Sequence, residues 1–131
     1  MIQDFFYIKY LFIFAYRINK NEKMKKITDL AVKNFYNKNS FSISNTSVEI
    51  TSSGFVYLKL FGNTIAGSDY SGTWITDAGW PTKTTFERLK GLNDVRIHTK
   101  KGQVYLNDEK WDGEKVYIDY NNGIKFINLR K

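Results

Sequence analysis

Cysteine is absent from the 131 residues of this sequence, and proline and histidine each occur once. Without cysteine there is no disulfide, no thiolate ligand and no cysteine nucleophile, which suits a reducing compartment. A lone histidine, His98, excludes a metal site built from several histidines. It stands between Arg96 and Lys100, with no carboxylate to orient it, so a solvated strand position is favoured over a catalytic base. We therefore expect no enzyme active site, no metal and no cofactor.

The sequence also has no apolar run long enough to cross a membrane as a helix. Residues 5–16 are apolar or aromatic apart from Lys9, but a spanning helix needs about 20 such residues. Asp4 precedes the run and no small-residue cleavage site follows it, which argues against a secretory signal. Residues 1–23 are then either an interfacial anchor or an extension upstream of a start at Met24. We favour the second alternative, so a membrane is not an expected partner.

Positive charge and aromatic residues are abundant instead. There are 20 Lys and Arg residues against 13 Asp and Glu, and the aromatic share is 17%. A net charge of +7 favours polyanionic partners through long-range attraction and counterion release. Phe, Tyr, Ile, Lys and Asn share A/T-rich codons, so the composition of the gene also accounts for part of the aromatic excess.

Short alternating segments predict an antiparallel α+β domain over residues 24–131: mostly a sheet of short, hairpin-connected strands, with two short helices. One helix is expected over 28–37, capped by Thr28-Asp29, and a second is expected to open at a capping box, Thr84-x-x-Glu87. Asn122-Gly123 is the strongest hairpin signal. Strands are expected over residues 41–43, 48–51, 55–61, 64–66, 73–76, 95–100, 104–106, 116–120 and 124–129.

Three motifs lack residues that the sites they resemble require. The spacing Gly62-x-x-x-x-Gly67-Ser68 lacks the lysine of a phosphate loop. The acidic stretch 108–119 carries Lys110 where a calcium ligand is required. The strand at 53–60 is a poor match to the aromatic strand of RNA-recognition domains, and the order of elements differs as well. None of these motifs supports a site.

The strongest candidate surface interleaves cations with aromatic rings around the expected second helix and the hairpin that follows. Charges that track phosphates and rings that stack on bases suit single-stranded nucleic acid. The alternative is an ordinary solvated strand face, with the tryptophans in the core. The candidate residues are Lys83, Arg88 and Lys90 near the helix, Arg96, His98, Lys100 and Lys101 on the hairpin, and the aromatic residues Trp80 and Tyr105.

Residues 60–115 resemble small uncharacterised domains that are common in tailed phages. The resemblance lies in Asn63-Thr64-Ile65-Ala66, in the stretch from Gly79-Trp80-Pro81 to Thr84-Thr85, in Val104–Asn107 and in Trp111-Asp112-Gly113. It implies a phage or mobile-element origin and transfers no site residue.

Together, charge and resemblance lead us to expect a small, basic, non-enzymatic binding module, with nucleic acid or a phage or host protein as partner. The alternative is a structural or assembly accessory protein of the virion. In that case the aromatic face of Phe55, Tyr57 and Phe61, or residues 1–23, would bury against a neighbouring subunit. The expected location is the host-cell cytoplasm or the virion.

Overall fold

The computed structural model describes residues 20–119 and 123–125. Two helices, α2 (Lys20–Asn37) and α3 (Lys83–Lys90), combine with ten short strands, and every pairing is antiparallel. This confirms the predicted α+β class. The strands are β1 (Phe41–Ile43), β2 (Thr46–Ile50), β3 (Val56–Leu60), β4 (Asn63–Asp69), β5 (Gly72–Ile75), β6 (Ile97–Lys100), β7 (Gln103–Leu106), β8 (Glu109–Lys110), β9 (Val116–Asp119) and β10 (Gly123–Lys125).

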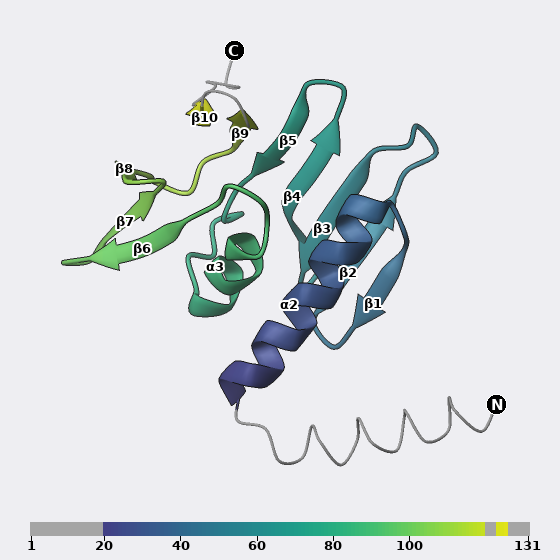
Figure 1. Cartoon of the computed structure of the whole chain (residues 1–131), viewed down its shortest axis with the longest axis horizontal. Coiled ribbons are helices and arrows are strands. Elements are labelled where there is room, and N and C mark those ends of the chain that lie inside the picture. Colours follow the sequence, from purple (N-terminus) through teal and green to yellow (C-terminus); the bar gives the residue numbers. More distant parts are fainter. Residues whose placement is uncertain (1–19, 120–122, 126–131) are drawn as a thin grey trace.

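The strands form two sheets of different size. The larger has the order β1-β2-β3-β4-β5-β9-β10, and the smaller has the order β6-β7-β8. Helix α2 lies across β2 and β3, with α3 beside it, and the smaller sheet extends from the far side of α3 (Figure 1). The chain thus leaves the large sheet after β5, builds α3 and the small sheet, and returns to pair β9 with β5.

One core connects these parts. In β3, Val56, Leu58 and Leu60 are buried on the face that α2 covers, as the alternation predicts. Helix α2 contributes residues four apart, Ala31 and Phe35, to the same cluster. The cluster continues through α3 into the small sheet and includes Leu89, Leu92, Val95, Ile97, Leu106 and Trp111.

The first helix begins earlier than the sequence predicted. Residues 20–27 are helical as well, so Thr28 is not a cap: its hydroxyl lies inside the helix and donates to the Met24 carbonyl oxygen at 3.0 Å. Lys, Glu and Met are good helix formers and extend the element toward the N-terminus without a special signal. Leu30, between the buried residues Ile27 and Ala31, is 38% exposed.

The second helix also starts before the predicted capping box. Thr82 is its N-cap, and the Thr82 hydroxyl accepts from the Thr85 backbone N–H at 3.1 Å. Thr84 is therefore a residue of the first helical turn. Two threonines stand two residues apart here, and the sequence pattern alone favoured the wrong one.

Some strand boundaries were wrong too. Strand β4 continues to Asp69, beyond the predicted strand over 64–66, because Gly67 pairs with Trp74 across the ladder. The hairpin predicted at Asn122-Gly123 is present, since β9 pairs with β10, but Gly123 itself pairs with Asp119 and belongs to β10. Residues 120–122, 126–131 and 1–19 lie outside the described residues, and the predictions for residues 1–19 and for the end of the last strand fall there.

The face of the large sheet turned away from α2 has an aromatic row of its own. Tyr57, Gly67, Trp74 and Tyr117 occupy neighbouring positions of β3, β4, β5 and β9. The Trp74 indole lies against Gly67, where a Cβ would collide with the ring. The Lys115 ammonium sits 4.1 Å from the Trp74 ring centroid, so Trp74 remains buried at 8% exposure although neither α2 nor α3 lies on this face.

Candidate nucleic-acid interface

The small sheet presents a stacked pair of rings on its exposed face. His98 of β6 and Tyr105 of β7 are direct cross-strand partners, with ring centroids 5.1 Å apart and planes within 9° of parallel. Lys110 of β8 lies opposite Tyr105, so a cation continues the row. His98 and Lys110 are exposed and Tyr105 is half-buried. The row is a flat, solvent-exposed platform with positive charge at one end.

Cations surround this platform on several sides. Arg96, Lys100 and Lys101 are all exposed, and Arg96 has one weak partner, Asp108, at 3.6 Å with both side chains largely exposed. A pair of that kind contributes little and leaves the guanidinium available to another anion. The structure therefore brings together four of the predicted cluster residues with Tyr105.

Two tight turns hold the platform in shape. Lys101 and Gly102 both have positive φ, 51° and 78°, in the turn that joins β6 to β7. Asn107 and Asp108 repeat this between β7 and β8, with φ of 49° and 70°. The Asn107 side chain accepts from the Arg96 N–H and donates to the Asp94 carbonyl, each at 2.7 Å. The backbone that carries the cations is thus tied down at both ends.

A cavity of about 310 Å³ lies where the small sheet meets α3. Lys83 and Lys90 line it from the helix and His98 lines it from β6, so the lysines predicted near the helix do meet the hairpin. Lys90 lies 3.9 Å from Glu87, the limit of an ion pair. The remaining lining residues are Pro81, Phe86, Ile97 and Thr99.

Arg88 does not belong to this surface, and its place in the predicted cluster was wrong. It is 1% exposed and points into the interior, where its guanidinium donates to Thr46, Thr28 and the Met24 carbonyl oxygen. Burial lowers the pKa of Arg88 from its ordinary value. The basic stretch 83–90 did not indicate which of its cations would face the core.

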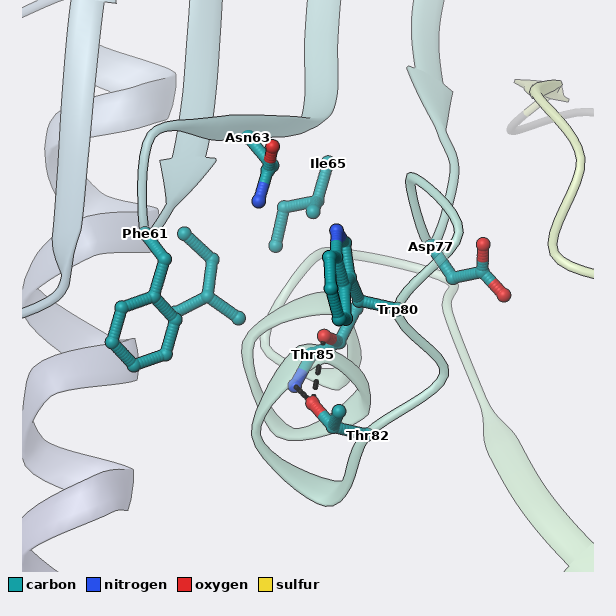
Figure 2. A pocket seen from close by; sticks show the side chains of 8 residues that line it. Phe61, Asn63, Ile65, Asp77, Trp80, Thr82 and Thr85 are labelled. Atoms are coloured by element: carbon teal, nitrogen blue, oxygen red, sulfur yellow. Dashed lines mark hydrogen bonds between the residues drawn. The ribbon is translucent and has the colours of Figure 1, made fainter.

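Trp80 is exposed, as a stacking residue must be, but it faces a second cavity rather than the platform. At 60% exposure it stands across from Phe61, over a cavity of about 310 Å³ (Figure 2). Phe61 and Lys110 were missed as site residues. Strand register across the turn at Asn107-Asp108 places Lys110 opposite Tyr105, and the sequence could have indicated this. The Phe61-Gly62 pair between two strands likewise indicated an exposed turn residue.

Asp77 is a buried carboxyl in the loop after β5. Burial raises its pKa above the ordinary value, Asp112 adds repulsion, and a hydrogen bond from the Gly79 N–H at 2.7 Å opposes the rise. The carboxylate packs against Gly113, where a Cβ would collide with it. These contacts give Asp77 a structural role in joining the loop after β5 to the loop before β9.

Within residues 20–119 and 123–125, no three His, Asp or Glu side chains gather in a way that could hold a metal ion. Over the same residues, no helix is long and apolar enough to span a membrane.

A model of the family described as Kyanoviridae Gp96 protein matches residues 24–127. The chain belongs to this phage protein family. The membership confirms the phage association that the resemblance implied. No curated protein and no solved structure matches the Gp96 family chain.

Proposed function

We propose that this Gp96 family protein is a non-enzymatic module that binds single-stranded nucleic acid on its small sheet. The observation that carries the proposal is the stacked His98–Tyr105 pair, flanked by cations on an exposed, rigidly connected surface. A nucleobase can extend the stack because every base has a π-face, and ammonium or guanidinium groups beside it attract the phosphates.

The surroundings of the platform support a strand rather than a duplex. The cations follow the edge of a small twisted sheet and continue into the cavity beside α3, where Lys83 and Lys90 project. Such an arrangement can track one flexible backbone while the ring pair takes up unpaired bases. We propose action in the host-cell cytoplasm or in the virion, where phage nucleic acid is found.

A non-enzymatic role is part of the proposal. The His98 ring stacks on Tyr105. Asp77, the carboxyl whose pKa is raised, accepts from the Gly79 N–H and packs against Gly113. No described nucleophile stands in hydrogen-bond contact with either group, as general base catalysis would require.

Fluorescence anisotropy with labelled DNA and RNA strands of about 12 nucleotides, a length within known site sizes, tests the proposal. We expect binding at low salt that weakens steeply as salt is raised, with no marked sequence preference. Tyr105→Ala should weaken binding at every salt concentration, by about fivefold or more. The double variant Lys100→Ala/Lys101→Ala should reduce the salt slope by about 0.7 for each phosphate that these lysines would otherwise neutralise.

Lys33→Ala and Lys25→Ala are the matched controls, because both lysines are exposed on α2, away from the small sheet. The control pair removes the same charge as the Lys100/Lys101 pair. Equal loss of affinity in both double variants would show that binding depends on net charge alone and not on this interface. Absence of binding at low salt would overturn the proposal.

A second candidate function, virion assembly, draws on the exposed aromatic residues Phe61 and Tyr70, at 73% and 90% exposure. The aromatic face expected from the sequence does not form as one patch, since Phe55 packs on Tyr70 and Tyr57 packs near Trp74. Light scattering over a range of concentrations tests this candidate. Self-association that Phe61→Asn abolishes would support it, and a monomer at all concentrations would count against it.

A further inference from the structure

Two exposed aromatic side chains stand on opposite sides of one cavity. Phe61, in the turn between β3 and β4, and Trp80, in the loop before α3, rise on either side of a space of about 310 Å³ (Figure 2). Leu60 is 4% exposed and Ile65 is 1% exposed, and both line the space between the rings. We call this space the aromatic groove.

The backbone holds both rings in place at some cost. Phe61 and Gly62 both have positive φ, 51° and 81°. A left-handed conformation suits Asn or Gly in such a turn and is unfavourable for a bulky ring. On the other side, Ala78 and Gly79 have φ of 56° and 83°. The Trp80 N–H donates to the Asp77 carbonyl at 2.9 Å, which fixes where the indole begins. These two turns fix the direction in which each ring leaves the backbone.

The lining is neutral, with a few polar groups. The Asp77 carboxylate is turned away from the groove (Figure 2) and is held by the Gly79 N–H. The Thr82 hydroxyl accepts from the Thr85 N–H and is therefore occupied by the helix cap. Exposed Asn63, at the rim, supplies an amide that can both donate and accept. A planar, uncharged ring with hydrogen-bonding edges matches this chemistry.

The groove shares a wall with the basic cavity beside the small sheet. Trp80 and Thr82 line the groove, while Pro81 and Lys83, the residues between and after them, line the basic cavity. A strand whose phosphates lie on Lys83 and Lys90 therefore passes within one short backbone segment of the groove.

We propose that the aromatic groove receives one unstacked base of the bound strand, between Phe61 and Trp80, while the adjoining phosphates contact Lys83. This rests on the proposed nucleic-acid binding and adds a base subsite to it. Cations next to a neutral aromatic slot fit a nucleotide, which is charged on its backbone and uncharged on its base. An apolar side chain of a protein partner would fit the aromatic groove but would gain nothing from the neighbouring lysines.

Tryptophan fluorescence of the full chain tests the subsite directly. Trp80 is 60% exposed, whereas Trp74 and Trp111 are 8% and 3% exposed, so an added strand should quench mainly Trp80. We expect quenching by an oligothymidylate and little quenching by an abasic strand of equal length. Trp80→Phe should remove the quenching and keep most of the affinity, because phenylalanine still stacks.

Anisotropy titrations of Phe61→Asn and Trp80→Ala complete the test. Asparagine accepts the left-handed turn, so the first variant removes the ring without adding strain. Each variant should weaken binding to the base-bearing strand by about fivefold to a hundredfold and leave binding to the abasic strand unchanged. Tyr70→Ala is the control, since Tyr70 is 90% exposed in another turn.

The outcomes separate the two proposals. If strands bind and Tyr105→Ala weakens them, but Phe61→Asn and Trp80→Ala do not, the base subsite is wrong and the sheet interface stands. Loss of abasic binding in the groove variants would also overturn the subsite, because a base would not be what the rings hold. No binding of any strand overturns both.

Discussion

Arg88 is an interior cation whose hydrogen bonds within residues 20–119 all go to neutral acceptors. Its guanidinium donates to the hydroxyls of Thr46 and Thr28 at 2.9 and 2.8 Å, to the Met24 carbonyl at 3.1 Å and to the Asn45 amide oxygen at 3.5 Å. These acceptors belong to α2 and to the start of β2, so one side chain of α3 ties three elements together. A buried charge is tolerated only when its donors are satisfied in this way.

Replacing Arg88 by alanine should therefore cost about 2–4 kcal/mol of unfolding free energy, since it leaves a cavity and several buried acceptors without a donor. Lys90→Ala, two residues later on the exposed side, should change stability by less than about 0.5 kcal/mol. Urea denaturation followed by circular dichroism measures both. A loss below about 1 kcal/mol for Arg88→Ala would mean that the network contributes little net stability.

Asp77 makes stability depend on pH in a predictable direction. Its pKa is raised from 3.8, chiefly by burial, so the folded state binds the proton more tightly than the unfolded state does. The contribution of Asp77 is then fully present below about pH 3.8 and is lost as pH rises through the higher folded value. Asp77→Asn keeps an oxygen for the Gly79 N–H and removes the charge.

We expect the unfolding free energy of Asp77→Asn to gain on that of the wild type as pH rises from about 4 to 7. Denaturation at several pH values measures the difference, and other carboxyls cancel in the comparison. Asp29→Asn, the same substitution at an exposed position of α2, is the matched control. A difference that stays flat or shrinks with pH would show that hydrogen bonding outweighs burial at this carboxyl.

At the scale of single elements, α3 depends on the threonine that caps it. Thr82→Ala removes the acceptor of the Thr85 N–H and should cost about 1 kcal/mol. Thr84→Ala should stay within about 0.5 kcal/mol, because Thr84 is a helical residue and alanine is a good helix former. Thermal melts of the two variants would show the reverse order if the Thr84-x-x-Glu87 pattern were the cap.

The elements also show what local sequence can and cannot predict. Alternation placed β3 and its buried face correctly, because a period of two is a property of the strand itself. The start of α2 was missed because Thr28, a good cap by residue type, serves inside the helix once α3 supplies a donor to it. Of the predicted site, cations on the hairpin could be read from alternation, whereas the burial of Arg88 depends on helix packing.

The aromatic groove could not be predicted from local sequence patterns either, because it also depends on tertiary packing. Phe61 and Trp80 are 19 positions apart, and neither turn reveals that it faces the other. They meet because β4 and β5 form a hairpin between them, whose length brings both turns to the same end of the sheet. Such juxtapositions depend on strand register over the whole sheet, which single-segment patterns do not contain.

At the scale of the whole molecule, the position where the fold begins can be tested by truncation. The first buried side chain of the described part of α2 is Ile27, and Glu22, Lys23 and Lys25 are exposed. Met24 contributes its carbonyl to Arg88 and to Thr28. The match to the family also begins at residue 24. Residues 24–131 should therefore retain the packing of Ile27, Ala31 and Phe35 against the core.

We expect the 24–131 form to melt within about 4 °C of the full chain, the shift that roughly 1 kcal/mol produces in a domain of this size. A 30–131 form is the matched comparison: it also loses Ile27, Thr28 and the Met24 carbonyl, and with them the acceptors on α2 for Arg88. It should melt lower by about 10 °C or more, or fail to fold, because a core side chain and a buried hydrogen-bond network are removed together. Thermal melts of the three forms decide whether residues 1–23 contribute to the core or play no part in the fold. If 24–131 melts as low as 30–131, residues before Met24 contribute to the core, and an extension that plays no part in the fold is ruled out.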